Sequence, residues 1–155
     1  MKILILSKGK KLYSTKRLVE ACEKQGHQPL VVDHTRCYFT IDKQDMAVYH
    51  KGKALTGIDA VIPRIGDSVT YFGTLIVHQF EKMNIFVTNP SQAILNSRDK
   101  LKSLQILTQA GLNVPRTAFA CNMDDISKTI DLVGGTPLVI KLLEGTQGIG
   151  VMLAD

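Results

Sequence analysis

A glycine-rich segment near the end of the sequence constrains the fold more than any other feature. An apolar run at 137–140 leads into Lys141 and two leucines, three glycines follow within 145–150, and a second apolar run covers 151–153. Short apolar runs on either side of glycines predict a strand, a loop and a strand. Because glycine has no Cβ, its backbone N–H groups can turn toward an anion, so the segment predicts a phosphate-binding loop beside Lys141. An ordinary hairpin turn with a solvated lysine is the alternative.

Two familiar phosphate motifs are excluded. A Walker A loop needs G-x-x-x-x-G-K-[ST] leading into a helix, whereas Gly150 is followed by Val151 and Met152. The dinucleotide fingerprint runs G-x-G-x-x-G, whereas this loop runs G-x-x-G-x-G and returns into an apolar strand. The pattern therefore favours a flap on a β-hairpin that closes over phosphates.

Composition limits the class of protein. A chain of 155 residues with 45% hydrophobic residues can form one core, with room for part of a second domain. No apolar run approaches the length of a membrane span and no signal peptide precedes the first strand, so a cytoplasmic protein without membrane association is expected. Cys22, Cys37 and Cys121 lack C-x-x-C spacing, which predicts buried or inert thiols rather than a disulfide framework or a zinc site.

The charge is basic. A net charge of +5 and a pI near 9.2 favour anionic partners such as nucleotides, acidic tails or RNA-rich particles. The basic residues are spread along the chain, so a solvated lysine-rich surface explains the charge equally well. The four histidines have no metal-ligand spacing and are expected to be structural: His27, His34, His50 and His78.

The first half of the chain predicts a parallel α/β sheet. The segment contains a strand at 3–6, a helix capped by Ser14 or Thr15 and ending near Gln25, and a strand at 30–33. Residues 34–47 are predicted to be mixed and turn-rich, and residues 48–55 to be a hairpin about Lys51 and Gly52.

A third strand at 59–62 presents Arg64 at its carboxyl end, where open α/β sheets place their ligand crevice. The planar guanidinium suits a carboxylate or a phosphate, and an ion pair with a nearby acid is the alternative. Residues 69–83 predict an amphipathic helix on the sheet, with Tyr71 and Phe72 in the core. A strand at 85–87 and a break at 88–91 follow, so domains of 1–90 and 91–155 are expected.

The second half predicts short helices before the glycine segment. Ser91 is expected to cap a helix across 93–95. Ser97 is expected to cap a second helix, with Asp99 at its positive end and Gly111 at its close. An edge strand at 116–120 and a helix over 122–132 come next. Lys100 lies in a first helical turn, where a cation is unfavourable unless it has an anionic partner.

The order of these parts resembles the ATP-grasp ligases, and most closely the RimK type, which adds glutamate to the C-terminus of a small-subunit ribosomal protein. The motifs that carry the resemblance are Arg98-Asp99-Lys100, the run from Pro137 to Lys141, and the segment from Glu144 to Val151. The resemblance covers the whole chain. It implies an α/β fold in which an N-terminal parallel-sheet pre-ATP-grasp domain is followed by an incomplete N-terminal part of an ATP-grasp domain.

The resemblance implies a carboxylate–amine ligase. ATP phosphorylates a carboxylate, and an amine then displaces phosphate from the acyl phosphate to form an amide. Lys100 and Lys141 match the two ATP-contacting lysines of the family, and Arg64 is assigned to substrate binding. The loop over the β- and γ-phosphates corresponds to Glu144, Gly145, Thr146, Gln147, Gly148, Ile149 and Gly150.

The implied partners are ATP with Mg²⁺ or Mn²⁺, L-glutamate, the C-terminal tail of the ribosomal protein, and another copy of the chain in a homo-oligomer. Direct nucleic acid binding is not required. Because metal ligands of the family are expected beyond Asp155, the chain is interpreted as an N-terminal fragment that has no catalytic residue and is inactive alone. The alternatives are an ATP-grasp ligase for another carboxylate (a carrier protein, a cofactor or a small peptide) and a non-catalytic binding module.

Overall fold

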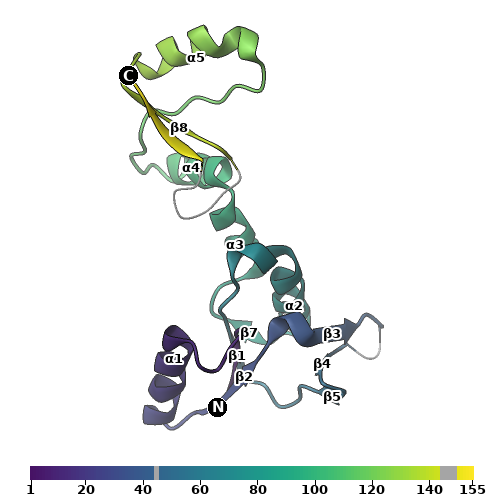
Figure 1. Ribbon diagram of the computed structural model, residues 1–155. Helices are drawn as coiled ribbons and strands as arrows, with labels where there is room; N and C mark the ends of the chain where they lie inside the picture. Colours follow the sequence, from purple (N-terminus) through teal and green to yellow (C-terminus); the bar gives the residue numbers. More distant parts are fainter. Residues whose placement is uncertain (44–45, 144–149) are drawn as a thin grey trace. The chain divides into compact units, whose positions relative to one another are not determined.

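The computed structural model describes residues 1–43, 46–143 and 150–155 (Figure 1). The chain divides into two compact units, residues 1–95 and 96–155. The elements of the first unit are β1 (Lys2–Leu6), α1 (Tyr13–Lys24), β2 (Gln28–Val32), η1 (His34–Arg36), β3 (Cys37–Thr40), β4 (Ala47–His50), β5 (Lys53–Ala54), β6 (Ala60–Pro63), η2 (Asp67–Val69), α2 (Thr70–Lys82), β7 (Phe86–Val87) and the start of α3 (Ser91–Arg98).

The first unit is built on the predicted parallel sheet, which the structure confirms. Its strand order is β2-β1-β6-β7, and Ile3 of the central strand β1 pairs with Pro29 on one side and Ala60 on the other. Helices α1 and α2 lie on opposite faces of this sheet (Figure 1). Because both faces are covered, β1 is apolar at every position from residue 3 to 6.

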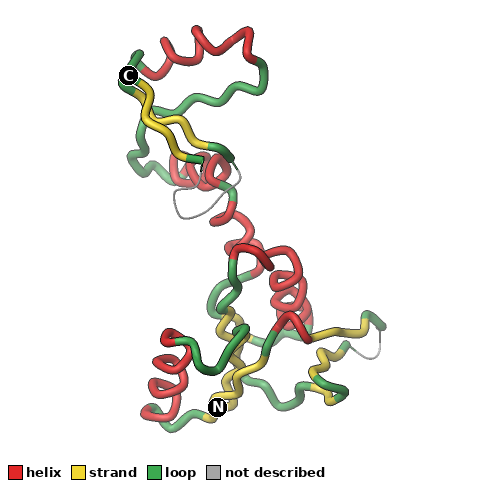
Figure 2. Tube along the Cα trace, in the orientation of Figure 1, coloured by secondary structure: helices red, strands yellow, loops and turns green. Residues whose placement is uncertain are grey.

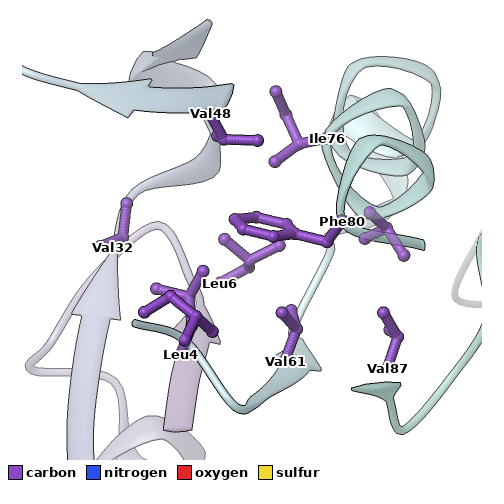
Figure 3. Packing of buried hydrophobic residues seen from close by; sticks show 10 residues of the cluster. Leu4, Leu6, Val32, Val48, Val61, Ile76, Phe80 and Val87 are labelled. Atoms are coloured by element: carbon purple, nitrogen blue, oxygen red, sulfur yellow. The ribbon is translucent and has the colours of Figure 1, made fainter. Parts of the chain in front are cut away.

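Side chains of β1 alternate between two packed clusters. Leu4 and Leu6 pack on the α2 face, whereas Ile3 and Ile5 pack on the α1 face. The ring of Phe80 points from α2 toward β1 and is fully buried (Figure 3). Burying one such side chain contributes about 2 kcal/mol, so these clusters are the main source of stability in this unit.

A small antiparallel sheet, ordered β3-β4-β5, adds to the first unit. The predicted hairpin about residues 51 and 52 is confirmed: Lys51 and Gly52 both have left-handed backbone conformations, with φ of 51° and 77°. Such a pair matches the twist of the flanking strands. The prediction for residues 34–47 missed β3, because half of its four residues face solvent and give no continuous apolar run.

The second unit contains the end of α3, α4 (Lys100–Gln109), η3 (Met123–Asp125), α5 (Ile126–Val133), β8 (Leu138–Lys141) and β9 (Val151–Ala154) (Figure 2). Strands β8 and β9 form an antiparallel pair from Leu138 with Ala154 to Lys141 with Val151, which confirms the two predicted strands. The helix that ends at Gly111 is also confirmed, with Gly111 in the left-handed conformation just beyond α4.

Three local predictions are wrong. Neither Ser14 nor Thr15 caps α1: the N-cap is Leu12 without a side-chain bond, and the Thr15 hydroxyl instead contacts the buried Ser7 hydroxyl at 2.8 Å. Asp99, not Ser97, caps α4 by accepting a hydrogen bond from the backbone N–H of Lys102. Residues 116–120 are not a strand. Thr117 and Phe119 favour a strand locally, but a strand also needs a neighbour that supplies its hydrogen bonds.

The expectation that Tyr71 and Phe72 lie in the core is also wrong. Their exposed fractions are 67% and 66%, and their rings pack edge-on against each other. The buried face of α2 is formed by Ile76, Val77 and Phe80, which leaves the other side of the first helical turn open to solvent.

The cysteines differ from one another. Cys22 is buried, and burial together with the charge of Glu23 raises the pKa of its thiol. Burial, reinforced by the charge of Asp33, raises the pKa of Cys37 to about 11. Both thiols are therefore protonated at neutral pH, whereas Cys121 is exposed, so of the predicted buried or inert thiols it is not a buried one. In the part of the chain that the structure describes, no helix is long and apolar enough to cross a membrane.

Candidate phosphate hairpin and substrate crevice

The predicted phosphate loop lies between β8 and β9. Its residues Glu144, Gly145, Thr146, Gln147, Gly148 and Ile149 are outside the described residues. The base of the loop is described: the N–H of Leu142 donates to the carbonyl of Gly150 at 2.8 Å. Gly150 has a φ of +73°, and a Cβ there would lie 2.7 Å from Cδ1 of Leu142. Only glycine fits this position without strain.

Lys100 reaches this base from α4. Its Nζ donates to the carbonyl oxygens of Leu142 at 2.9 Å and Leu143 at 3.2 Å. These carbonyls directly follow Lys141, the last residue of β8. The structure thus brings Lys100 to the stretch that links Lys141 to the glycine loop. The carbonyl dipoles also explain how a lysine is accommodated in the first turn of α4, where Asp99 satisfies the helix end.

This arrangement suits a polyphosphate. The Lys100 ammonium group at the base of the hairpin can neutralise phosphate oxygens. The described residues do not form a metal centre. Within residues 1–43, 46–143 and 150–155, no group of three or more His, Cys, Asp or Glu side chains is placed to hold a metal ion.

The second predicted position, Arg64, follows β6. In the order β2-β1-β6-β7 the chain changes direction across the sheet between β1 and β6, and this switch point is where open α/β sheets bind ligands. Arg64 lies there: its N–H donates to the carbonyl of Leu6 at 2.8 Å, and its Nη2 donates to the Ser14 hydroxyl at 3.2 Å. Among the described residues it forms no ion pair with an acid.

A basic pocket that the sequence prediction missed lies at the carboxyl ends of β1 and β2. This cavity of about 260 Å³ is lined by Ser7, Lys8, Gly9, Lys10, Val31, Asp33, Arg36, His50 and Lys51. The run Ser7-Lys8-Gly9-Lys10 directly after β1 was a usable signal, because it lies at the ligand edge of the sheet. Arg36 and Lys51 could not be predicted as lining residues from sequence spacing, because η1 and the β4–β5 turn bring them to the pocket from other segments.

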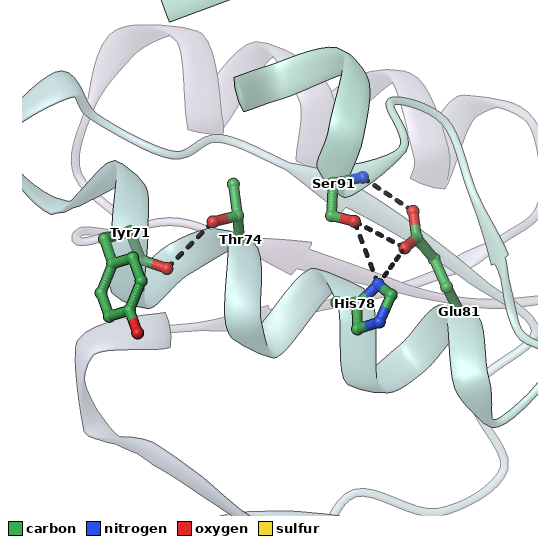
Figure 4. Close-up of polar contacts among 5 residues, drawn as sticks. All are labelled: Tyr71, Thr74, His78, Glu81 and Ser91. Atoms are coloured by element: carbon green, nitrogen blue, oxygen red, sulfur yellow. Dashed lines mark hydrogen bonds and ion pairs between the residues drawn. The ribbon is translucent and has the colours of Figure 1, made fainter. Parts of the chain in front are cut away.

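A Ser–His–Glu cluster in the first unit invites a catalytic interpretation, which its geometry rejects (Figure 4). Nδ1 of His78 lies 3.1 Å from Oε2 of Glu81 and 3.3 Å from Oγ of Ser91, so both partners meet the same ring nitrogen. A charge-relay triad needs them on opposite nitrogens. Here Glu81 accepts from the Ser91 N–H and hydroxyl, both at 2.7 Å, and thereby caps α3 from outside the helix.

The pKa of Glu81 reflects this role. Burial alone would raise the pKa of this carboxyl, but the hydrogen bonds from Ser91 and the contact with His78 outweigh burial and lower it. Glu81 is therefore ionised at neutral pH, as a helix N-terminus favours.

The fold and these sites define the class: the chain is an α/β protein of the ATP-grasp type, with a pre-ATP-grasp domain followed by part of an ATP-grasp domain. A solved ATP-grasp RimK domain protein from Sphaerobacter thermophilus has the same fold, with a TM-score of 0.70 and 19% identity over 99% of this chain and 54% of that chain. Residues 1–94 match the RimK PreATP-grasp domain and residues 97–155 match the RimK-like ATP-grasp domain. The chain belongs to the RimK family.

The relatives of this chain are named as glutamate ligases. A probable alpha-L-glutamate ligase of Vibrio cholerae is 54% identical over 100% of this chain and 52% of the relative. A probable alpha-L-glutamate ligase of Alcanivorax borkumensis is 56% identical over 100% of this chain and 51% of the relative. The chain thus spans about half the length of these relatives.

Proposed function

We propose that this chain supplies the phosphate-binding hairpin and the substrate crevice of an ATP-dependent ligase that adds L-glutamate to the C-terminus of a small-subunit ribosomal protein in the cytoplasm. Membership of the RimK family and the relatives named probable alpha-L-glutamate ligase support this proposal. The observation that carries it is the contact of Lys100 with the carbonyls at the base of the β8–β9 hairpin.

In the proposed reaction, ATP supplies the phosphoryl group that converts the acceptor's terminal carboxylate into an acyl phosphate. The amine of glutamate then attacks the acyl carbon, the new C–N bond forms, and inorganic phosphate leaves. Lys100 exchanges its two carbonyl contacts for phosphate oxygens, and Lys141 holds a second position beside the same loop. Each charge-assisted hydrogen bond of this type is worth about 1.5–3 kcal/mol. The loop N–H groups from Gly145 to Gly150 complete the phosphate contacts and keep water away.

The proposed division of labour follows the two parts of the sequence. Residues 1–90 position the substrate, with Arg64 holding a carboxylate at the switch point of the sheet. Residues 91–155 contribute the hairpin. The ligands of the divalent metal are proposed to come from polypeptide that corresponds to the second half of the relatives, so chelation of Mg²⁺ and Mn²⁺ should abolish the reaction.

The test combines this chain with a polypeptide corresponding to the second half of the Vibrio cholerae relative. The mixture receives ATP, Mg²⁺, L-glutamate and a synthetic peptide with the acceptor's C-terminal residues. The expected product is a peptide heavier by one or more glutamyl residues, detected by mass spectrometry, with release of ADP. If the two polypeptides associate and bind ATP but ligate no glutamate, the proposed activity is wrong.

Substitutions then test the assigned lysines. Lys100→Ala and Lys141→Ala should each lower kcat/KM by about 10- to 100-fold, since each removes a charge-assisted phosphate contact. Lys102→Ala is the matched control: it lies on α4 two residues away, and its contact to Asp99 uses its backbone N–H, which the substitution keeps. Equal losses in Lys100→Ala and Lys102→Ala would contradict the assignment.

A further inference from the structure

The basic pocket carries charge that the phosphate hairpin does not use. Four cationic side chains line it, from Lys8, Lys10, Arg36 and Lys51, against the single carboxylate of Asp33. That carboxylate is already engaged: it accepts from the Thr35 N–H at 3.0 Å and the Thr35 hydroxyl at 2.7 Å, and Nε of Arg36 lies 3.6 Å away. A concave surface lined by one sign of charge concentrates oppositely charged ligands.

One residue that lines the pocket also carries a buried polar atom without a partner. Nε2 of His50 is buried, and it has no hydrogen-bond partner among the residues that the structure describes. A buried polar group without a partner is costly, and such groups mark places where a ligand or water completes the site. His50 also lines the cavity, and because its Nε2 is itself closed to solvent, a ligand would reach this nitrogen only after the ring turns.

The lining favours carboxylates on an extended chain over a nucleotide. No Phe, Tyr or Trp ring is among the lining residues, so the pocket lacks the large aromatic surface on which a base stacks most strongly. The cations come from three separate segments rather than from one glycine nest, which suits charges spaced along a peptide better than one phosphate group.

We propose that the basic pocket binds an acidic peptide, in which several glutamate or aspartate side chains contact the lysines at residues 8, 10 and 51. The inference rests on the proposed function only in identifying this peptide with the tail that glutamate addition lengthens. Binding itself is a property of residues 1–95. In this arrangement the first unit retains the growing acidic tail between successive additions.

The experiment measures fluorescence anisotropy of a labelled oligo-L-glutamate on the present 155-residue chain, without ATP. Oligo-L-glutamine of the same length should not bind, and binding of the acidic peptide should weaken as salt is added. Lys51→Gly is the principal variant. Because Lys51 has a φ of 51°, glycine accepts this backbone more readily than lysine does, so the substitution removes the charge and keeps the turn.

Lys51→Gly should weaken peptide binding about fivefold, and Lys8→Ala combined with Lys51→Gly about 20-fold, as expected for partly screened charge pairs. Lys53→Ala is the charge-matched control, since Lys53 is exposed in the same hairpin and does not line the pocket. It should weaken binding by less than about twofold. An equal effect of the two single substitutions would show a general charge effect and overturn the proposal.

Competition separates the ligand classes. Unlabelled oligo-L-glutamate should displace the probe, whereas tripolyphosphate should need at least about tenfold higher concentration, because it spans fewer of the cations. Displacement by tripolyphosphate at equal concentration would identify a phosphate site and refute the proposal, as would absence of peptide binding. If the acidic peptide binds but the two associated polypeptides ligate no glutamate, the proposal for the basic pocket holds. The proposed ligase activity is then wrong.

Discussion

The two units of the chain contain similar fractions of apolar residues but bury them to different extents. In the first unit, the sheet is covered on both faces and residues such as Leu4, Ile5 and Phe80 are fully buried. In the second, no described residue is buried, and Leu132 and Leu153 are exposed at 62% and 69%. Apolar content alone therefore does not indicate a core, because side chains must also have a second layer to pack against.

This difference also separates the candidate sites of the first unit from that of the second. Arg64 and the basic pocket lie at the ends of strands whose positions are fixed by a packed core. The phosphate hairpin rests on two strands and a lysine contact, with little buried apolar area to hold them. We expect the first unit to hold its side chains in fixed positions without a ligand. We expect the second unit to become more rigid when it binds a ligand or another polypeptide.

The largest expected contrast comes from two phenylalanines. Phe80→Ala should lower the free energy of unfolding by about 3–5 kcal/mol, because it leaves a cavity in the packed cluster. Phe119→Ala, at a side chain that is 52% exposed in the second unit, should cost less than about 1 kcal/mol. Urea denaturation monitored by circular dichroism measures both, and equal losses would show that the second unit has a core of its own.

Two glycines with nearly the same backbone sharpen the comparison. Gly150→Ala should destabilise the β8–β9 hairpin by about 1–3 kcal/mol, since the new Cβ meets Leu142 in addition to the unfavourable φ. Gly52→Ala, with a φ of +77° and nothing near the added atom, should show only the backbone cost of about 1 kcal/mol.

Hydrogen exchange of the Leu142 amide measures the stability of the β8–β9 hairpin at Gly150. Hydrogen exchange of the amides near His50 measures the stability of the turn at Gly52. Adding Leu142→Ala to Gly150→Ala should recover part of the loss. If it recovers nothing, the clash does not contribute and backbone strain alone requires the glycine.

The cap of α3 by Glu81 gives a pH-dependent effect. Because the pKa of Glu81 is lower in the folded than in the unfolded state, its contribution is complete above the unfolded value of about 4.3 and is lost as the pH falls through the folded value. Glu81→Gln should therefore cost about 1–2 kcal/mol at neutral pH and little in acid.

Thermal unfolding of both proteins across this pH range measures the effect. Glu20→Gln is the control, because Glu20 pairs with Arg17 on the exposed surface of α1 and should cost under about 0.5 kcal/mol. A Glu81→Gln loss that stays constant into acid would contradict the role of the ionised carboxyl.

Local patterns predicted the strands and helices that have strong periodicity. The continuous apolar run of β1 and the glycines at positions 111 and 150 were each sufficient to place an element or its end. The failures concern the choice of a partner: Asp99 caps α4 in place of the predicted Ser97. Thr15 was predicted as a cap and instead contacts Ser7, and Ser91 is held by Glu81 from another helix.

The candidate sites show the same difference between residues that local patterns predict and residues that only the fold brings together. Lys100, Lys141 and Arg64 were predicted from motifs and strand ends. The structure adds the contacts of Lys100 with the carbonyls of Leu142 and Leu143, and of Arg64 with the Ser14 hydroxyl. The basic pocket could not be predicted, because Arg36 and Lys51 approach Lys8 only through the fold of η1 and the β4–β5 turn. Sequence spacing carries no signal for such convergence.

Residue-resolved hydrogen exchange on the chain alone tests the central claim, that residues 1–95 form a self-sufficient core and residues 96–155 do not. Amides of β1 and β6 should exchange at least about 100-fold more slowly than those of β8 and β9, because the former open only on global unfolding. Adding the polypeptide that corresponds to the second half of the relatives, together with ATP, should slow exchange in β8 and β9 and leave β1 unchanged. Equal protection of β1 and β8 in the chain alone would contradict the account.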